Sequence, residues 1–206
     1  MRGRIPIALA ALVTGALLAS PASAAAPAIV DVGDDFYAPK KYEGSIGTDV
    51  NWLPDVGAAD EHNVLANSKL FDSGSLTTSI DYTISPSAGT FAYYCSSHGT
   101  KSGNGMAGTL KVAPAFGSMK RGGSFVAVNW ASDGSFAKTG DQYDVRWKGP
   151  GTKGKYKNWL KNTADGGGDF GTGNQPTNYK PNKKYSIQAR SEDSSKPKKR
   201  KSGWSP

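Results

Sequence analysis

Cysteine and histidine are scarce in this sequence of 206 residues, which contains one cysteine, Cys95, and two histidines, His62 and His98. A single cysteine excludes an intramolecular disulfide. Two histidines are too few for several histidine-bound metals within one subunit. Sustained helical patterns are also missing, because no long segment repeats its apolar residues at helical spacing. These absences exclude disulfide-stapled scaffolds and all-helical folds, and they draw attention to the few thiol and imidazole groups that are present.

The N-terminal residues contain an apolar run of limited length. Arg2 and Arg4 precede this run, which covers about residues 5–18, and the small side chains of Ala22-Ser23-Ala24 follow it. This order predicts a secretory signal peptide over residues 1–24. The run is shorter than the ~20 residues that a spanning helix needs, and no cysteine near the cleavage point allows lipid attachment. We therefore expect an exported protein, secreted or associated with the cell surface.

Charge divides the remainder of the chain into two halves. Residues 25–114 carry 5 basic and 10 acidic side chains, a net charge of −5, whereas residues 115–206 carry 18 basic and 7 acidic, a net charge of +11. The sign changes beside Val112-Ala113-Pro114-Ala115, which has the composition of a short linker. The sequence therefore predicts one domain over residues 25–114 and a second, basic domain over residues 115–206.

Short apolar or alternating segments, separated by Gly, Pro, Asn, Asp and Ser, predict an all-β protein built from sandwiches. We expect strands over residues 28–32, 49–53, 63–65, 79–84, 90–94 and 109–112, and then over 125–130, 142–147, 159–160 and 185–190. Residues 99–105 are rich in Gly and Ser and predict a loop. Gly166-Gly167-Gly168 and Gly171-Thr172-Gly173 predict a flexible loop, and the lysine-rich residues 194–202 predict a solvated surface.

Four side chains of the first half form a distinctive donor set: His62, Cys95, His98 and Met106. Two imidazoles, one thiolate and a thioether are the donors of protein blue copper sites, in which the methionine is the weak axial ligand. Three of the four come from one strand–loop–strand connection. A lone thiol in an exported protein is also exposed to oxidation unless something occupies it. The sequence therefore predicts one copper ion bound by this set.

The residues around these donors resemble the plastocyanin and amicyanin branch of the cupredoxins over most of residues 28–112. The motifs that carry the resemblance follow the family's order: Tyr37-Ala38-Pro39, Gly47-Thr48-Asp49-Val50-Asn51-Trp52, His62-Asn63-Val64, Phe71-Asp72-Ser73-Gly74, Gly89-Thr90-Phe91-Ala92-Tyr93-Tyr94-Cys95 and Met106-Ala107-Gly108-Thr109-Leu110-Lys111-Val112. The resemblance implies a cupredoxin Greek-key β-sandwich in which His62, Cys95 and His98 are equatorial copper ligands and Met106 is the axial one. It also implies that His98 passes the electron. Seven residues separate His98 from Met106, which is more than the family usually has.

Other uses of the donor residues fit the sequence less well. Structural zinc sites favour two or more thiolates or carboxylates, and a methionine donor argues against zinc. A nucleophilic Cys95 would need a histidine base with an orienting Asp or Asn, and no such residue is evident. An ordinary core cysteine would not require histidines and a methionine at matching positions. Copper therefore remains the interpretation that uses all four side chains.

The second half weakly resembles a fibronectin type III domain, which is an immunoglobulin-like β-sandwich. The similar segments are Phe125-Val126-Ala127-Val128-Asn129-Trp130, Tyr143-Asp144-Val145-Arg146-Trp147 and Tyr185-Ser186-Ile187-Gln188-Ala189-Arg190. The last of them resembles the strand that holds the tyrosine corner. Gly203-Trp204-Ser205-Pro206 would then open a final strand that the chain cuts short.

These patterns predict a single-electron carrier rather than an enzyme, working with a redox partner protein that the sequence does not name. Two alternatives remain: copper capture or delivery without redox turnover, and a surface adhesion module whose sandwich has become structural. The basic second half either serves solubility alone or binds an anionic cell-wall polymer or membrane surface by long-range attraction. We expect no nucleic-acid partner, because the predicted signal peptide is incompatible with nuclear targeting.

Overall fold

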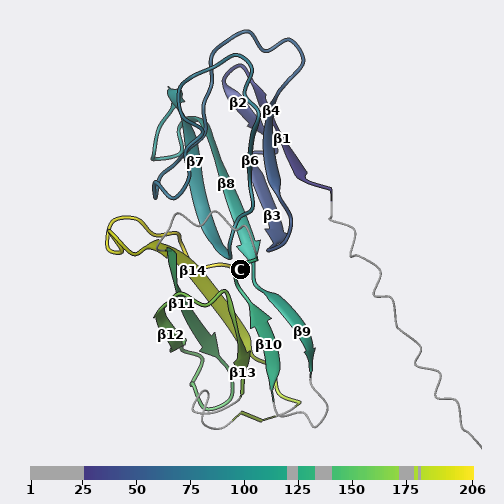
Figure 1. Cartoon of the computed structure of the whole chain (residues 1–206), viewed down its shortest axis with the longest axis vertical. Helices are drawn as coiled ribbons and strands as arrows, with labels where there is room; N and C mark the ends of the chain where they lie inside the picture. Colours follow the sequence, from purple (N-terminus) through teal and green to yellow (C-terminus); the bar gives the residue numbers. More distant parts are fainter. Residues whose placement is uncertain (1–25, 120–124, 133–140, 172–178, 181) are drawn as a thin grey trace, which may run out of the picture.

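The computed structural model describes residues 26–119, 125–132, 141–171, 179–180 and 182–206. The predicted signal peptide over residues 1–24 and most of Gly171-Thr172-Gly173 lie outside these residues. Every regular element in the described part of the chain is a β-strand (Figure 1), so the predicted all-β sandwich class is confirmed. The described residues contain no helix capable of crossing a membrane.

The first half consists of two four-stranded sheets, with the strand orders β2-β1-β4-β6 and β3-β8-β7-β5. Parallel pairing joins β1 to β4 and β3 to β8, and the other neighbours are antiparallel. The strands are β1 (Ala28–Gly33), β2 (Phe36–Ala38), β3 (Lys41–Ser45), β4 (Val50–Pro54), β5 (Leu65–Ala66), β6 (Tyr82–Ile84), β7 (Gly89–Gly99) and β8 (Gly105–Ala113).

A hydrophobic core of the first half surrounds Trp52, whose side chain is fully buried. The centroid of its ring lies 5.4 Å from that of Tyr93, 5.8 Å from that of Tyr82 and 5.9 Å from that of Phe71. Aromatic rings at such separations contribute packing beyond simple burial. Side chains alternate along a strand, so on β7 Tyr93 and Cys95 share the buried face. The strand that builds the core thus also carries the thiol into it.

The second half contains two three-stranded sheets, β13-β10-β9 and β12-β11-β14. Their strands are β9 (Ala115–Met119), β10 (Val126–Asn129), β11 (Asp141–Lys148), β12 (Lys157–Thr163), β13 (Gly167–Phe170) and β14 (Ser186–Asp193). Trp130 and Phe170 are buried in a second hydrophobic cluster. The Tyr185 hydroxyl accepts a hydrogen bond from the Lys180 backbone N–H at 2.9 Å, a contact of the kind that the expected tyrosine corner makes. The domain boundary at residue 115 stays a prediction, and only Pro114 separates β8 from β9.

Glycine positions account for one wrong prediction. The flexible loop expected at Gly166-Gly167-Gly168 is instead a strand from Gly167 onward, where β13 begins and pairs with β10. A Cβ on Gly167 would lie 2.4 Å from the Asn129 side-chain oxygen, and one on Gly168 would lie 3.2 Å from the Trp130 ring. These glycines therefore serve close packing in a strand, which in sequence looks the same as flexibility.

The C-terminal residues lie between the two halves (Figure 1). Gly203 forms an antiparallel bridge with Thr90 of β7, with N–O distances of 2.8 and 3.0 Å. On the other side, the Ser202 N–H donates to the Ser191 carbonyl of β14 at 2.9 Å. The Ser191 and Ser87 hydroxyls, both buried, are hydrogen-bonded at 2.6 Å. The segment expected to open a truncated last strand thus connects β14 of the second half to β7 of the first.

Candidate metal centre

Three of the predicted donors meet at one end of the first half. His62 belongs to the loop between β4 and β5, where a two-way backbone bridge to Thr77 fixes it, with N–O distances of 2.9 and 3.0 Å. Cys95 and His98 lie near the C-terminal end of β7, where the pairing with β8 is interrupted between Tyr94 and Gly99. This irregularity bends the strand and turns His98 back toward the thiol.

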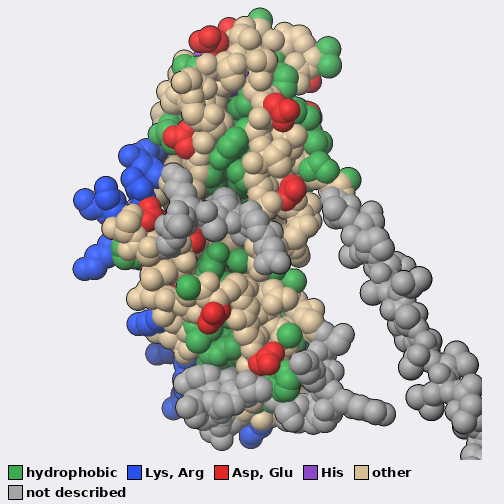
Figure 2. All heavy atoms as spheres, viewed as in Figure 1, with side chains coloured by type: hydrophobic (Ala, Val, Ile, Leu, Met, Phe, Trp, Pro, Cys, Tyr) green, Lys and Arg blue, Asp and Glu red, His purple; other side chains and the backbone are tan. Residues whose placement is uncertain are grey.

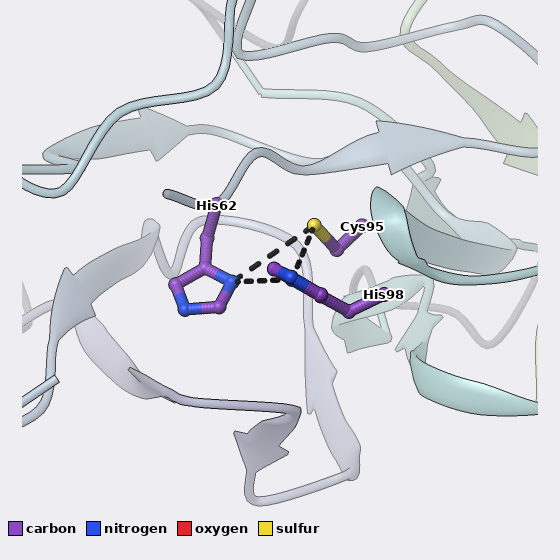
Figure 3. Close-up of side chains that lie close together, drawn as sticks. All are labelled: His62, Cys95 and His98. Carbon is purple, nitrogen blue, oxygen red and sulfur yellow. Dashed lines mark hydrogen bonds between the residues drawn. The ribbon is translucent and has the colours of Figure 1, made fainter. Parts of the chain in front are cut away.

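The donor atoms form a compact triangle, in which both histidines present Nδ1 to the Cys95 sulfur (Figure 3). The Cys95 Sγ lies 3.9 Å from Nδ1 of His62 and 3.7 Å from Nδ1 of His98, and the two nitrogens are 3.2 Å apart. A point equidistant from three atoms with these spacings lies about 2.1 Å from each, which matches a metal–nitrogen bond and is about 0.2 Å shorter than a typical metal–sulfur bond. One metal ion therefore fits all three donors at once.

Asp34 orients His62 from the side away from the thiol. Its Oδ1 lies 3.3 Å from Nε2 of His62, and its carboxylate accepts backbone N–H bonds from Ala59 and Asp60 at 3.0–3.2 Å. The backbone bonds from Asp60 and Ala59, followed by the contact with His62, hold the pKa of Asp34 below its usual value. We assign the ring proton of His62 to Nε2, because an ionised carboxylate can only accept. Nδ1 then points a free lone pair at the centre, as metal-bound histidines with a carboxylate partner do.

Asn63 ties the two segments of the centre together. Its side-chain oxygen accepts the Ser96 backbone N–H at 2.9 Å, and its side-chain nitrogen donates to the Gly74 carbonyl at 3.1 Å. The Tyr37 hydroxyl donates to its backbone carbonyl at 2.5 Å. Asn63 adjoins His62, so its position was a usable signal that sequence reasoning did not exploit. Asp34 lies far upstream in sequence and gave no signal.

The side chain of Met106 is fully buried in the same core cluster as Cys95. It lies on β8 between Gly105 and Ala107, opposite the interruption of β7 that contains Cys95 and His98. Along β8, Met106 alternates in step with Leu110, which pairs with the buried Phe91. The structure thus places Met106 on the core side of the sheet, across from the segment that carries two of the donors.

The loop expected over residues 99–105 is confirmed for residues 100–104, and it is one residue too long at each end. β7 continues to Gly99, β8 begins at Gly105, and these two residues pair. A turn closes between them through hydrogen bonds from Thr100 N to Asn104 O and from Gly103 N to Thr100 O, both 3.0 Å. The additional residues between His98 and Met106 therefore form a hairpin tip, which brings the chain back beside the centre.

Two glycines make the close return of this hairpin possible. A Cβ on Gly99 would lie 2.1 Å from the Met106 carbonyl oxygen, and one on Gly105 would lie 2.3 Å from the His98 carbonyl oxygen. Gly105 also has a φ of 67°, which favours glycine. Gly99 thus approaches the Met106 backbone, and Gly105 the His98 backbone, more closely than a side chain at position 99 or 105 would allow.

The known proteins to which this chain is similar were found among solved structures. No protein-family model matches the chain, and no curated protein matches it. The oxidised form of a singly substituted amicyanin is 24% identical with a TM-score of 0.35, covering 46% of this chain and 89% of that protein. Oxidised plastocyanin from Dryopteris crassirhizoma is 25% identical with a TM-score of 0.33, covering 41% of this chain and 99% of that protein. The chain is similar to these proteins over less than half of its length.

A matched pair of glycine substitutions tests the hairpin geometry. Gly103 and Gly105 both have positive φ, 89° and 67°, but only Gly105 faces a backbone collision. We expect Gly103→Ala to lower the free energy of unfolding by about 1–2 kcal/mol, the cost of the left-handed conformation. Gly105→Ala should cost about 1–3 kcal/mol more, because the His98 backbone must shift. Urea denaturation followed by tryptophan fluorescence measures both values. Equal losses of stability in the two variants would contradict the close approach of Gly105 to the His98 backbone.

Proposed function

We propose that this chain is an exported type 1 copper protein that carries single electrons, with His62, Cys95 and His98 as equatorial ligands and Met106 as the axial ligand. The observation that carries the proposal is the triangle of two Nδ1 atoms and one Sγ, whose spacings of 3.2, 3.7 and 3.9 Å leave room for one ion. Export rests on the signal pattern of residues 1–24.

The donor types favour copper over other metals. Thiolate is a soft ligand that suits Cu(I), whereas imidazole suits both oxidation states. Two imidazoles and one thiolate are also the trigonal donors of blue copper sites. When bound here, copper supplies a one-electron couple. The task of the chain is to keep these donors in one arrangement in both states.

Rigid positioning is what the surrounding residues contribute. Asp34 holds the His62 ring, Asn63 holds the backbone beside Cys95, and the backbone bridge to Thr77 fixes the His62 loop. His62 and Cys95 are nearly inaccessible to solvent, whereas His98 is partly exposed. His98 is therefore the ligand that offers an electron a path between the centre and a partner protein.

We propose a carrier rather than an enzyme, because both histidines of the sequence belong to this one cluster. A further histidine-bound copper within one subunit would lack imidazole ligands. The alternatives are copper capture or delivery without redox turnover, and adhesion through a fold that no longer binds metal. Reversible electrochemistry of the copper-loaded protein separates the carrier from a delivery protein, and failure to bind copper would exclude both.

The basic second half favours attachment to an anionic surface. Lysine and arginine side chains gather along the left edge of the molecule, with the largest groups near mid-height and smaller ones below (Figure 2). The segment after β14 carries three exposed lysines, Lys196, Lys198 and Lys199. We propose that this edge attracts an anionic cell-wall polymer, with an anionic membrane surface as the alternative. Such attraction weakens as salt is added.

Addition of Cu(II) to the purified protein tests the site assignment. We expect an intense visible thiolate-to-copper absorption band and a narrow copper hyperfine splitting by electron paramagnetic resonance. Cys95→Ser should lose the band and retain the fold, because serine is nearly isosteric and only the thiolate supplies the charge transfer. A band that persists in Cys95→Ser would show that the thiol is not the ligand.

Leucine substitution tests the axial role of Met106. Removal of a weak thioether donor destabilises Cu(II) more than Cu(I), so Met106→Leu should raise the reduction potential. A tenfold change in the relative affinity for the two states corresponds to about 59 mV. Met119→Leu, at the end of β9, is the matched control and should leave the potential unchanged. Equal potentials in Met106→Leu and the unmodified protein, measured by voltammetry, would exclude Met106 as a ligand.

A further inference from the structure

Lysine is distributed unevenly over the acidic first half. Residues 25–114 contain five lysines and no arginine, and four of these lysines line a single hollow of about 440 Å³: Lys40, Lys41, Lys101 and Lys111. No aspartate or glutamate is among the residues that line it. The ten acidic residues of this half therefore lie outside the lining of this concave area.

The hollow lies on the solvent face of the β3-β8-β7 sheet, opposite the hydrophobic core. Ala92 of β7 pairs with Thr109 of β8, and Thr109 pairs with Lys41 of β3, so these three residues form a row across its floor. The hairpin tip that follows His98 contributes Lys101 and forms one wall. Strands supply the floor and a hydrogen-bonded turn supplies the wall, which makes the hollow a built feature of the fold.

Two of the four lysines have no acidic partner among the described residues. Lys41 and Lys111 lie 2.6 and 3.3 Å from Glu43, which they share. Lys40 and Lys101 form no ion pair with any residue that the structure describes. The cluster therefore keeps a net positive charge, which attracts anions to a concave surface, and its ammonium groups can donate charge-assisted hydrogen bonds.

Asn67 holds the hairpin tip that carries Lys101. Its side-chain nitrogen donates to the Lys101 carbonyl at 2.8 Å, which anchors the hairpin tip to the segment that follows β5. Its side-chain oxygen is buried and accepts no hydrogen bond from the described residues. Because this oxygen is buried, what Asn67 supplies to the hollow is the hydrogen bond that holds Lys101 in place.

We propose that the hollow binds a small anion that also carries hydroxyl groups, such as a sugar acid or a sugar phosphate. The lysines account for the negative group, and the side-chain hydroxyls of Thr100 and Thr109 account for the hydroxyl groups of the ligand. The volume lies within the range of small-ligand sites, about 300–1,000 Å³. This inference is independent of the metal centre, although the bound molecule would contact the turn two residues beyond His98.

Nuclear magnetic resonance titration of the full protein tests the proposal with four probes: glucuronate, glucose 6-phosphate, glucose and inorganic phosphate. We expect at least one of the two sugar anions to bind saturably and to shift the amide signals of residues 100–103. Glucose, which lacks the charge, should not bind, and inorganic phosphate should bind at least tenfold more weakly than the preferred sugar anion. The preferred sugar anion identifies the acidic group as carboxylate or phosphate.

Variants separate specific binding from the general effect of charge. The double variant Lys40→Gln/Lys101→Gln should weaken binding at least tenfold. Lys69→Gln, which removes the one lysine of this half outside the hollow, should change it less than twofold. Core amide signals that keep their positions show that each variant is folded. Absence of binding by both sugar anions, equal binding of glucose, equal binding of inorganic phosphate, or an equal loss in Lys69→Gln would overturn the proposal.

Discussion

The convergence of two imidazole nitrogens and one thiol sulfur on a single point is the constraint around which the first half is arranged. Three polar atoms within 3.9 Å of one another, in a largely buried position, require a frame that orients each ring. That frame has separate parts: Asp34 fixes the tautomer of His62, Asn63 links the two donor segments, and Gly105 allows the hairpin to return past His98. Loss of any one part would change the spacing of the donors rather than the donors themselves.

Sequence reasoning could find what is encoded locally. The apolar segment over residues 90–94 predicts the strand that carries Cys95, and the rarity of Cys95, His62 and His98 marks the donors. It could not find contacts between distant residues, such as Asp34 with His62 or Gly203 with Thr90. Glycine was the other source of error. Gly99, Gly105 and Gly167 lie in strands, and these positions require glycine because a Cβ would collide with a neighbouring chain segment. Sequence composition does not distinguish this requirement from flexibility.

Charge separates the surfaces of the molecule by role. The candidate metal centre lies at one end of an acidic half, the lysine-lined hollow lies on the outer face of the same half, and 18 basic residues belong to the second half. The C-terminal segment connects these parts, because it pairs with β7 on one side and β14 on the other. β7 therefore carries Cys95 and His98 at one end and receives the second half at the other, so that one strand links the donors to the basic half.

X-ray absorption spectroscopy at the copper edge, on the protein loaded with one equivalent of copper, tests the central claim most directly. Because the spacings of Nδ1 of His62, Nδ1 of His98 and Sγ of Cys95 leave one common centre, the first shell should contain two nitrogen scatterers and one short sulfur scatterer. This shell should change little between the oxidised and the reduced protein. A first shell of nitrogen and oxygen alone, without sulfur, would contradict the account.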